Sequence, residues 1–237
     1  QFIAITSDGT KAYLPQTRSN VTNKALLFDT TVFPIVNVVD LSEFNLLVTE
    51  RITLDTADEP VNMPFAVVLS PDNKILYLSN AGSNDVSVID LVTNKGIAHI
   101  DVGSNPRGIA INADGSRVFV NNVLDGTLSV IDTEKLSLSD QIKLTDIPLD
   151  PTLLQGKRIF NSSASPVLST DNWISCATCH FDGMMDSRTW LGFPDGPRNT
   201  PSLLGVKDTL PIHWSGDFDE LQDVEITIRD IQFGNGL

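Results

Sequence analysis

An internal repeat of 42 residues limits the fold of this chain more than any other feature of its sequence. Residues 64–73 align with residues 106–115, and the same offset relates residues 86–90 to residues 128–132. Each copy consists of short runs rich in Val, Ile, Phe and Tyr, which strands favour, separated by Asp-Gly or Asp-Asn turns. Four short strands in about 42 residues is the period of a β-propeller blade. The repeat therefore predicts propeller blades.

About three copies fit into residues 1–148, because a longer copy begins near Ile3. Closed propellers have about four to eight blades, so we expect a partial propeller whose open edges need partners. A two-sheet sandwich is the alternative, but nothing in a sandwich requires this repeat. At residues 76–90 and 118–132 the pattern resembles the propeller family named for its Tyr-Val-Thr-Asn (YVTN) strand, although those four letters do not occur intact.

Both cysteines of the chain lie in one short motif, Cys176-Ala-Thr-Cys179-His180. This is the pattern of covalent c-type haem attachment, in which each thiol adds to a porphyrin vinyl group and the histidine binds the iron. A zinc site would need two more ligands, and only His99 and His213 remain as histidines. A redox-active pair would not need the histidine, and a disulfide over so short a span is strained. We therefore predict haem c, with His180 as its proximal ligand.

The blade pattern ends near Pro148, and residues 149–237 are predicted to form a second domain. Residues 153–160 have helical spacing, and apolar residues recur at intervals of three and four between Leu221 and Ile231, which is typical of a helix. We expect a mixed fold class, in which all-β propeller blades are followed by a mainly α, cytochrome c-like haem domain.

Three further side chains are candidates for the haem pocket. His213 is either the distal ligand of the iron or a hydrogen-bond partner of a propionate. Trp214 packs either on the haem or in the core. Arg198 either pairs with a propionate or is an ordinary surface arginine. Calcium is bound by carboxylates, and the candidates here are Asp182, Asp186 and Asp195. Most such carboxylates are merely solvated.

The segments around the haem motif form a set. They read Ser-Cys-Ala-Thr-Cys-His-Phe-Asp-Gly at residues 175–183, Gly-Pro-Arg-Asn-Thr-Pro-Ser-Leu-Leu-Gly at residues 196–205 and Pro-Ile-His-Trp-Ser-Gly at residues 211–216. This set resembles the first haem domain of bacterial di-haem cytochrome c peroxidases. The chain departs from that family at Ser215, where the family usually has Asp, and it lacks a distal histidine near Gly196. The resemblance implies a second Cys-x-x-Cys-His domain outside the printed sequence.

Motif and resemblance together predict an exported c-type haem protein that transfers electrons, alone or as part of a di-haem peroxidase-like oxidoreductase. The alternative is a propeller that acts as a binding module and carries a structural or relay haem. Covalent haem attachment takes place outside the cytoplasm, so we expect a periplasmic or extracellular location. The remaining propeller blades, like the second haem domain, are expected from outside the printed sequence.

The charge of the chain narrows the choice of partners. It has 16 Lys and Arg against 30 Asp and Glu, a formal net charge of −14, and a mean hydropathy of +0.02. Such an acidic chain cannot neutralise phosphates, which argues against a nucleic-acid partner. No apolar run approaches the ~20 residues of a membrane helix. We expect a redox protein as the partner, and a basic one, because opposite charges steer association.

Overall fold

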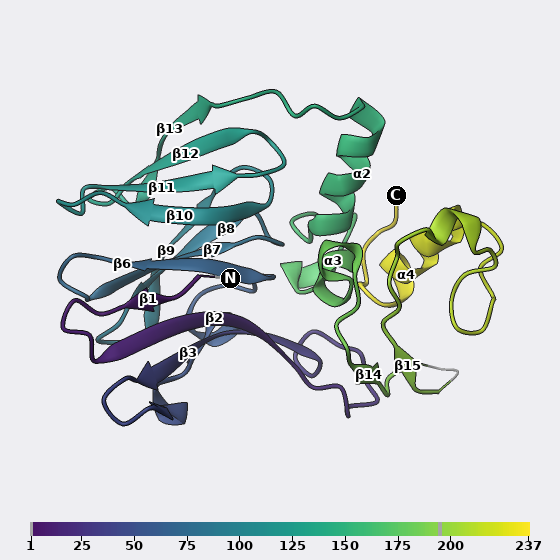
Figure 1. The fold of residues 1–237 in the computed structure, drawn as a ribbon, viewed down its shortest axis with the longest axis horizontal. Helices are drawn as coiled ribbons and strands as arrows, with labels where there is room; N and C mark the ends of the chain where they lie inside the picture. Colours follow the sequence, from purple (N-terminus) through teal and green to yellow (C-terminus); the bar gives the residue numbers. More distant parts are fainter. Residues whose placement is uncertain (1, 194–195) are drawn as a thin grey trace.

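Three antiparallel β-sheets stand side by side in chain order (Figure 1), and we call them blades 1, 2 and 3. The computed structural model describes residues 2–193 and 196–237. Blade 1 contains β1 (Ala4–Ile5), β2 (Lys11–Ser19), β3 (Val32–Asp40), β4 (Asn45–Leu46) and β5 (Ile52–Thr53). Blade 2 contains β6 (Pro64–Leu69), β7 (Ile75–Asn80), β8 (Asp85–Asp90) and β9 (Lys95–Asp101). Blade 3 contains β10 (Pro106–Ile111), β11 (Arg117–Asn122), β12 (Thr127–Asp132) and β13 (Ser137–Lys143).

The sequence repeat is a structural repeat. Every strand of blade 3 begins 42 residues after its counterpart in blade 2. Even the irregularities recur, because the register shift between Pro64 and Ala66 on β6 has its counterpart between Pro106 and Gly108 on β10. The prediction of repeated four-stranded antiparallel units is therefore confirmed for blades 2 and 3, whereas blade 1 has a fifth strand, β5, which pairs with β3.

A buried asparagine ends the second strand in both blade 2 and blade 3. The Asn80 side chain donates to Ser87 Oγ at 3.1 Å, and Asn122 donates to Ser129 Oγ at 2.9 Å. All four side chains are fully buried. Because an unpaired polar group in the interior costs about 1–3 kcal/mol, these bonds fix the pairing of the second and third strands.

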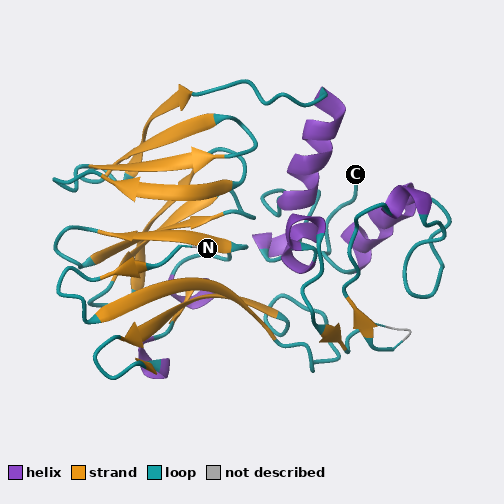
Figure 2. Ribbon diagram, viewed as in Figure 1, coloured by secondary structure: helices purple, strands orange, loops and turns teal. Residues whose placement is uncertain are grey.

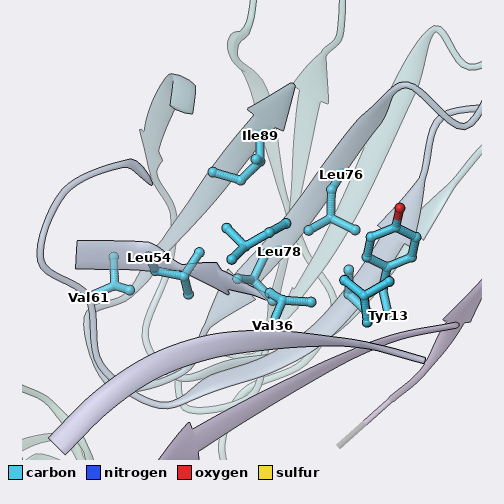
Figure 3. Packing of buried hydrophobic residues seen from close by; sticks show 10 residues of the cluster. Tyr13, Val36, Leu54, Val61, Leu76, Leu78 and Ile89 are labelled. Carbon is cyan, nitrogen blue, oxygen red and sulfur yellow. The ribbon is translucent and has the colours of Figure 1, made fainter. Parts of the chain in front are cut away.

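Hydrophobic side chains fill the space between adjacent blades. One cluster joins blades 1 and 2, and Figure 3 shows its packing. Its buried members are Tyr13, Val36, Val38, Ile52, Leu54, Val61, Val67, Leu76, Leu78 and Ile89. A second cluster joins blades 2 and 3 and consists of Tyr77, Val86, Val88, Ile100, Val118, Val120 and Ile131. Each blade is thus held by the apolar face of its neighbour.

The C-terminal part lies to one side of the blades and contains most of the helix in the chain (Figure 2). Its α-helices are α2 (Pro151–Asn161), α3 (Cys176–Cys179) and α4 (Glu225–Asp230), and its two short strands, β14 (Thr189–Trp190) and β15 (Arg198–Asn199), pair with each other. Single 3-10 turns lie at Thr170–Asn172, Phe181–Gly183, Val206–Asp208 and Leu221–Val224. Within residues 2–148, the described part of the blade region, only Val48–Glu50 (3-10) and α1 (Leu54–Ala57) are helical.

The prediction of a mainly α, cytochrome c-like domain over residues 149–237 is wrong. The structure is built mostly from β-sheets, and α2, α3 and α4 have only 11, 4 and 6 residues. Glycine and proline, which interrupt helices, are dense between Gly192 and Gly216. The apolar stripe that predicted one helix from Leu221 to Ile231 is divided between a 3-10 turn and α4.

No helix in the described part of the chain is both long enough and apolar enough to span a membrane.

His99 lies on β9 and ties blade 2 to the segment that precedes it. Its Nδ1 lies 3.0 Å from Asp58 Oδ2, and its Nε2 lies 3.5 Å from Asp85 Oδ2. Both carboxylates are nearly inaccessible to solvent. Their hydrogen bonds raise the pKa of His99 to about 10, against the opposing effect of burial.

This raised pKa predicts that the free energy of unfolding falls as the pH rises from about 6.5 to about 10, where the folded chain loses a proton that the unfolded chain has already lost. His99→Gln should remove that slope and destabilise the fold by about 2–4 kcal/mol at pH 6, because two buried carboxylates lose their cation. Chemical denaturation at several pH values measures both effects. Glutamine is a suitable replacement because Gln141 occupies the equivalent strand position in blade 3. A wild-type slope that survives in His99→Gln would contradict this assignment.

Candidate functional site

The two cysteines lie on α3, a single turn of helix that is fixed by its own cap. The N-cap residue Ser175 and Thr178 form a capping box, in which the Ser175 N–H donates to Thr178 Oγ1 at 3.0 Å. Such reciprocal capping satisfies backbone donors that a helix of four residues could not satisfy itself. The turn is therefore defined locally, by the residues around and between the cysteines.

The side of α3 opposite the cysteines is seated on the blades. Ala177 has no exposed surface, and it packs with Met63, Phe65, Ala66 and Ala81 of blade 2 and the loops beside it. A larger side chain at residue 177 would have to displace this cluster, because protein interiors are close-packed. The seat thus fixes which side of α3 faces away from the blades.

Asn62 adds a polar connection next to this apolar one. Its side-chain amide donates to the Trp173 carbonyl at 2.7 Å and to Thr178 Oγ1 at 3.0 Å. The residue is 2% exposed, so these bonds are made away from water. A Cβ at Gly82 would overlap the Asn62 side chain, which shows how closely the chain passes at this point.

The environment of the cysteines is unlike that of a reactive thiol pair. Both are free, and both are partly buried. Burial raises the pKa of Cys176, and burial together with the Asp186 carboxylate raises that of Cys179 to about 12. Redox-active pairs require a lowered pKa, so the geometry disfavours that alternative. The Gln232 amide near Cys176 Sγ, at 3.6 Å, places the C-terminal segment beside α3.

His180 is held in one tautomer. Its Nδ1 lies 3.0 Å from the Pro201 carbonyl oxygen, which can only accept, so Nδ1 carries the proton. Burial lowers the pKa of His180, more than its hydrogen bond to Pro201 raises it. A neutral imidazole with Nδ1–H on a carbonyl leaves the Nε2 lone pair for a metal, which is the usual arrangement of a metal-binding histidine.

The loop that supplies Pro201 is itself fixed by Trp190. The indole Nε1 donates to Asp186 Oδ2 at 2.9 Å and to Thr200 Oγ1 at 3.2 Å, and Trp190 is 4% exposed. This support cannot be recognised from the sequence. Thr200 and Pro201 lie within the Arg-Asn-Thr-Pro-Ser-Leu segment, but no local pattern shows that its carbonyl reaches a histidine 21 residues earlier.

His213 lies in a separate local cluster. Its Nδ1 is 3.4 Å from Asp217 Oδ1, and its ring stacks on Phe218 at a centroid distance of 3.7 Å. It is close enough to His180 for the electrostatic interaction between the two side chains to contribute, as the smallest of several causes, to the lowered pKa of His180. Its assignment as the distal ligand stays a prediction.

The other two pocket candidates lie on the loops near His213. Trp214 is 61% exposed, and its indole Nε1 donates to the Asn199 carbonyl at 2.6 Å, so it does not fill a core. Arg198 lies on β15, opposite Trp190 on β14, and is partly buried. Their contacts with a haem stay predictions.

The proposed calcium carboxylates are not gathered into a site. Asp182 pairs with Arg107, and Asp186 accepts from Trp190, while Asp195 lies outside the described residues. Over residues 2–193 and 196–237, no group of three or more His, Cys, Asp or Glu side chains could hold a metal ion. Within that range a zinc site at the cysteines has no further ligands either.

Comparison with known proteins identifies the family. Residues 49–172 match the cytochrome D1 heme domain, which is slightly more than half of the chain. The chain belongs to the cytochrome D1 heme domain family. Membership agrees with the propeller blades and places the chain, at a coarse level, in haem-related redox biochemistry. The match runs across the predicted boundary at residues 148 and 149 and ends before Cys176, so the domain division stays a prediction.

Individual relatives match shorter stretches. Dihydro-heme d1 dehydrogenase of Pseudomonas aeruginosa is 35% identical over 77 residues, which is 32% of this chain and 15% of that protein. The PE-PGRS family protein PE_PGRS18 of Mycobacterium tuberculosis is 45% identical over 51 residues, 22% of this chain and 11% of that protein. The chain therefore covers only a small part of either relative.

Two solved structures are partly similar. Hydrazine synthase of Kuenenia stuttgartiensis has a TM-score of 0.47 and 26% identity, covering 61% of this chain and 36% of that one. Dihydro-heme d1 dehydrogenase NirN in complex with DHE has a TM-score of 0.36 and 28% identity, covering 47% and 22%. A c-type cytochrome joined to YVTN blades is not shown by these matches, and both of those likenesses stay resemblances.

Asn62→Ala tests the connection between the blades and α3. We expect a loss of about 1–3 kcal/mol in the free energy of unfolding, because the Trp173 carbonyl and the Thr178 hydroxyl lose a buried partner. Chemical denaturation measures the loss. The exposed Asn45 on β4 provides the control, since Asn45→Ala should stay within about 0.5 kcal/mol of wild type. Equal effects of the two substitutions would refute the role of Asn62.

Proposed function

We propose that this chain carries a covalently attached haem c on Cys176 and Cys179, with His180 as the proximal ligand, and that it transfers electrons. One observation carries the proposal: two thiols on the side of α3 that faces away from the blades are followed by a histidine whose Nδ1 donates to a carbonyl. The donor set fits a haem, because the thiols are the attachment groups and the neutral Nε2 is the iron ligand.

Each side of the motif has a separate task. Ala177 and Thr178 hold the turn on the blades, while the cysteines and His180 are left for the cofactor. The bound haem iron would supply the chemistry, a change between ferrous and ferric states. The Pro201 carbonyl holds the His180 proton on Nδ1, so His180 would not have to change its protonation when a bound iron changed its oxidation state.

Apolar side chains for a haem surface are present on the loops next to His180. The Leu203 N–H donates to the Gly183 carbonyl at 2.9 Å, which brings two of these loops together. The exposed apolar residues of the segment are Phe181, Met184, Met185, Leu204, Leu210 and Trp214. Large apolar side chains left on a surface are typical of a site that something else covers, and a porphyrin face has the matching chemistry.

The proposal includes a partner and a location. An electron carrier with a net charge of −14 would be served best by a basic redox protein, through electrostatic steering. Covalent attachment implies export to the periplasm or beyond. A peroxidase-like reaction is a further extension, which depends on the second haem domain that the resemblance implies.

Blade 3 supports the expectation of further blades. In blade 2, the face formed by Tyr77, Val86, Val88 and Ile100 is covered by blade 3. The residues 42 positions later, Phe119, Leu128, Val130 and Ile142, form the corresponding face of blade 3, where Ile142 is 44% exposed. We propose that another blade of the same type packs there.

The double substitution Cys176→Ala/Cys179→Ala tests the attachment. Wild-type chain exported by a host that attaches haem c should give a c-type pyridine haemochrome spectrum and retain its haem in acidified acetone. The double variant should retain none, because no thioether can form. Haem that is extracted from both proteins would show non-covalent binding and would overturn the proposal.

His213→Ala tests the distal position separately. If His213 binds the iron, ferric wild-type protein is low-spin, and the variant shifts toward high spin as the sixth ligand is lost. Electronic absorption and electron paramagnetic resonance spectra measure the change. Asp217→Asn, which leaves the imidazole in place, serves as the control. An unchanged spin state in His213→Ala would place this histidine outside the coordination sphere.

A further inference from the structure

The turn directly after His180 has an unusual backbone. Residues Phe181–Gly183 form a 3-10 turn in which Asp182 has φ 52° and Gly183 has φ 78°. Left-handed conformations are uncommon for residues other than glycine, although Asp tolerates them better than most. Something must therefore favour this conformation of Asp182, which sets the direction of the chain as it leaves the proximal histidine.

Arg107 of blade 3 reaches this turn from the blades. Its guanidinium donates to Asp182 Oδ1, with 2.7 Å between the nitrogen and the oxygen. The carbon at its centre lies 5.3 Å from the ring centroid of Phe65 and 5.3 Å from that of Phe181. The two rings are stacked on each other, with centroids 6.3 Å apart and an interplanar angle of 18°.

These contacts connect blades 2 and 3 with Phe181 and Asp182, the two residues that follow His180. Phe65 and Arg107 occupy equivalent positions, 42 residues apart, each second in the first strand of its blade. The repeat therefore places an aromatic ring and a cation side by side at one end of the blades. Phe181 stacks on the ring, and Asp182 pairs with the cation.

The geometry points to Arg107 as a positioning residue for His180: by gripping Phe181 and Asp182, it fixes the turn through which the proximal ligand is oriented. The haem part of this inference rests on the function proposed above, but the grip on the turn does not.

The identity of the side chain matters for this grip. The planar guanidinium can donate to a carboxylate while its faces lie against aromatic rings, which the compact ammonium of lysine does less well. The ion pair is partly exposed, with the Arg107 and Asp182 side chains 22% and 52% accessible, so it is weak alone. The two ring contacts add to the ion pair. Together, the ion pair and the ring contacts reduce the frequency of local opening of the turn by about fivefold or more.

Hydrogen exchange of the chain without haem tests the grip itself. The Gly183 N–H donates to the His180 carbonyl at 2.8 Å, and the Met184 N–H donates to the Phe181 carbonyl at 3.0 Å. Arg107→Gln should accelerate exchange at these two amides by about fivefold or more. Arg117→Gln is the matched control, because Arg117 pairs with Asp132 at the other end of the same blade.

The haem-loaded chain tests the consequence for His180. Arg107→Gln leaves the Asp182 charge uncompensated and should lower the midpoint potential relative to wild type and to Arg117→Gln. Arg107→Gln/Asp182→Asn restores the charge balance but not the grip. We expect the double variant to recover the potential in part, while its ferric electron paramagnetic resonance signal is broader than that of wild type, because the orientation of His180 is less uniform.

The possible results separate the positioning role of Arg107 from the proposed haem function. Unchanged exchange at Gly183 and Met184 in Arg107→Gln would overturn the positioning role, whatever the haem content. A double variant with the wild-type signal and potential would show that only charge matters, which would overturn it as well. A chain that folds but never acquires haem c would count against the proposed function, while the exchange experiment would still decide the role of Arg107.

Discussion

The packing of α3 against the blades determines the geometry of the whole site. Ala177 is enclosed by blade 2, and the Asn62 amide satisfies the Trp173 carbonyl and the Thr178 hydroxyl beside it. A turn of four residues has too few internal hydrogen bonds to hold its own orientation. Its direction is therefore determined by the blades, and the cysteines necessarily face the other way.

One side of α3 therefore packs on the blades, while the other side carries the groups for the cofactor. The blade side is dry and close-packed, whereas the cofactor side has two protonated thiols and the neutral His180. The Pro201 carbonyl defines the His180 tautomer from a loop far away in the sequence. Both supports come from residues outside the motif, so the motif alone does not make the site.

The blades could be predicted from the sequence, but much of the C-terminal part and of the candidate site could not. Turns containing Asp-Gly and alternating apolar residues have a fixed local geometry, so strands could be placed from the 42-residue offset alone. The segment after Pro148 has no such period, and its glycines and prolines leave its course to long-range contacts. The cysteines were recognisable by spacing, whereas the roles of Asn62, Trp190 and Arg107 depend on partners that only the fold brings near.

The position of the iron decides whether His180 is the proximal ligand. A crystal structure of the exported, haem-loaded chain, with anomalous data at the iron absorption edge, would locate the metal without any assumption about the porphyrin. We predict an anomalous peak within coordination distance of His180 Nε2, on the side of the imidazole ring opposite the Pro201 carbonyl. An iron peak among the blades, with none at His180, would contradict it.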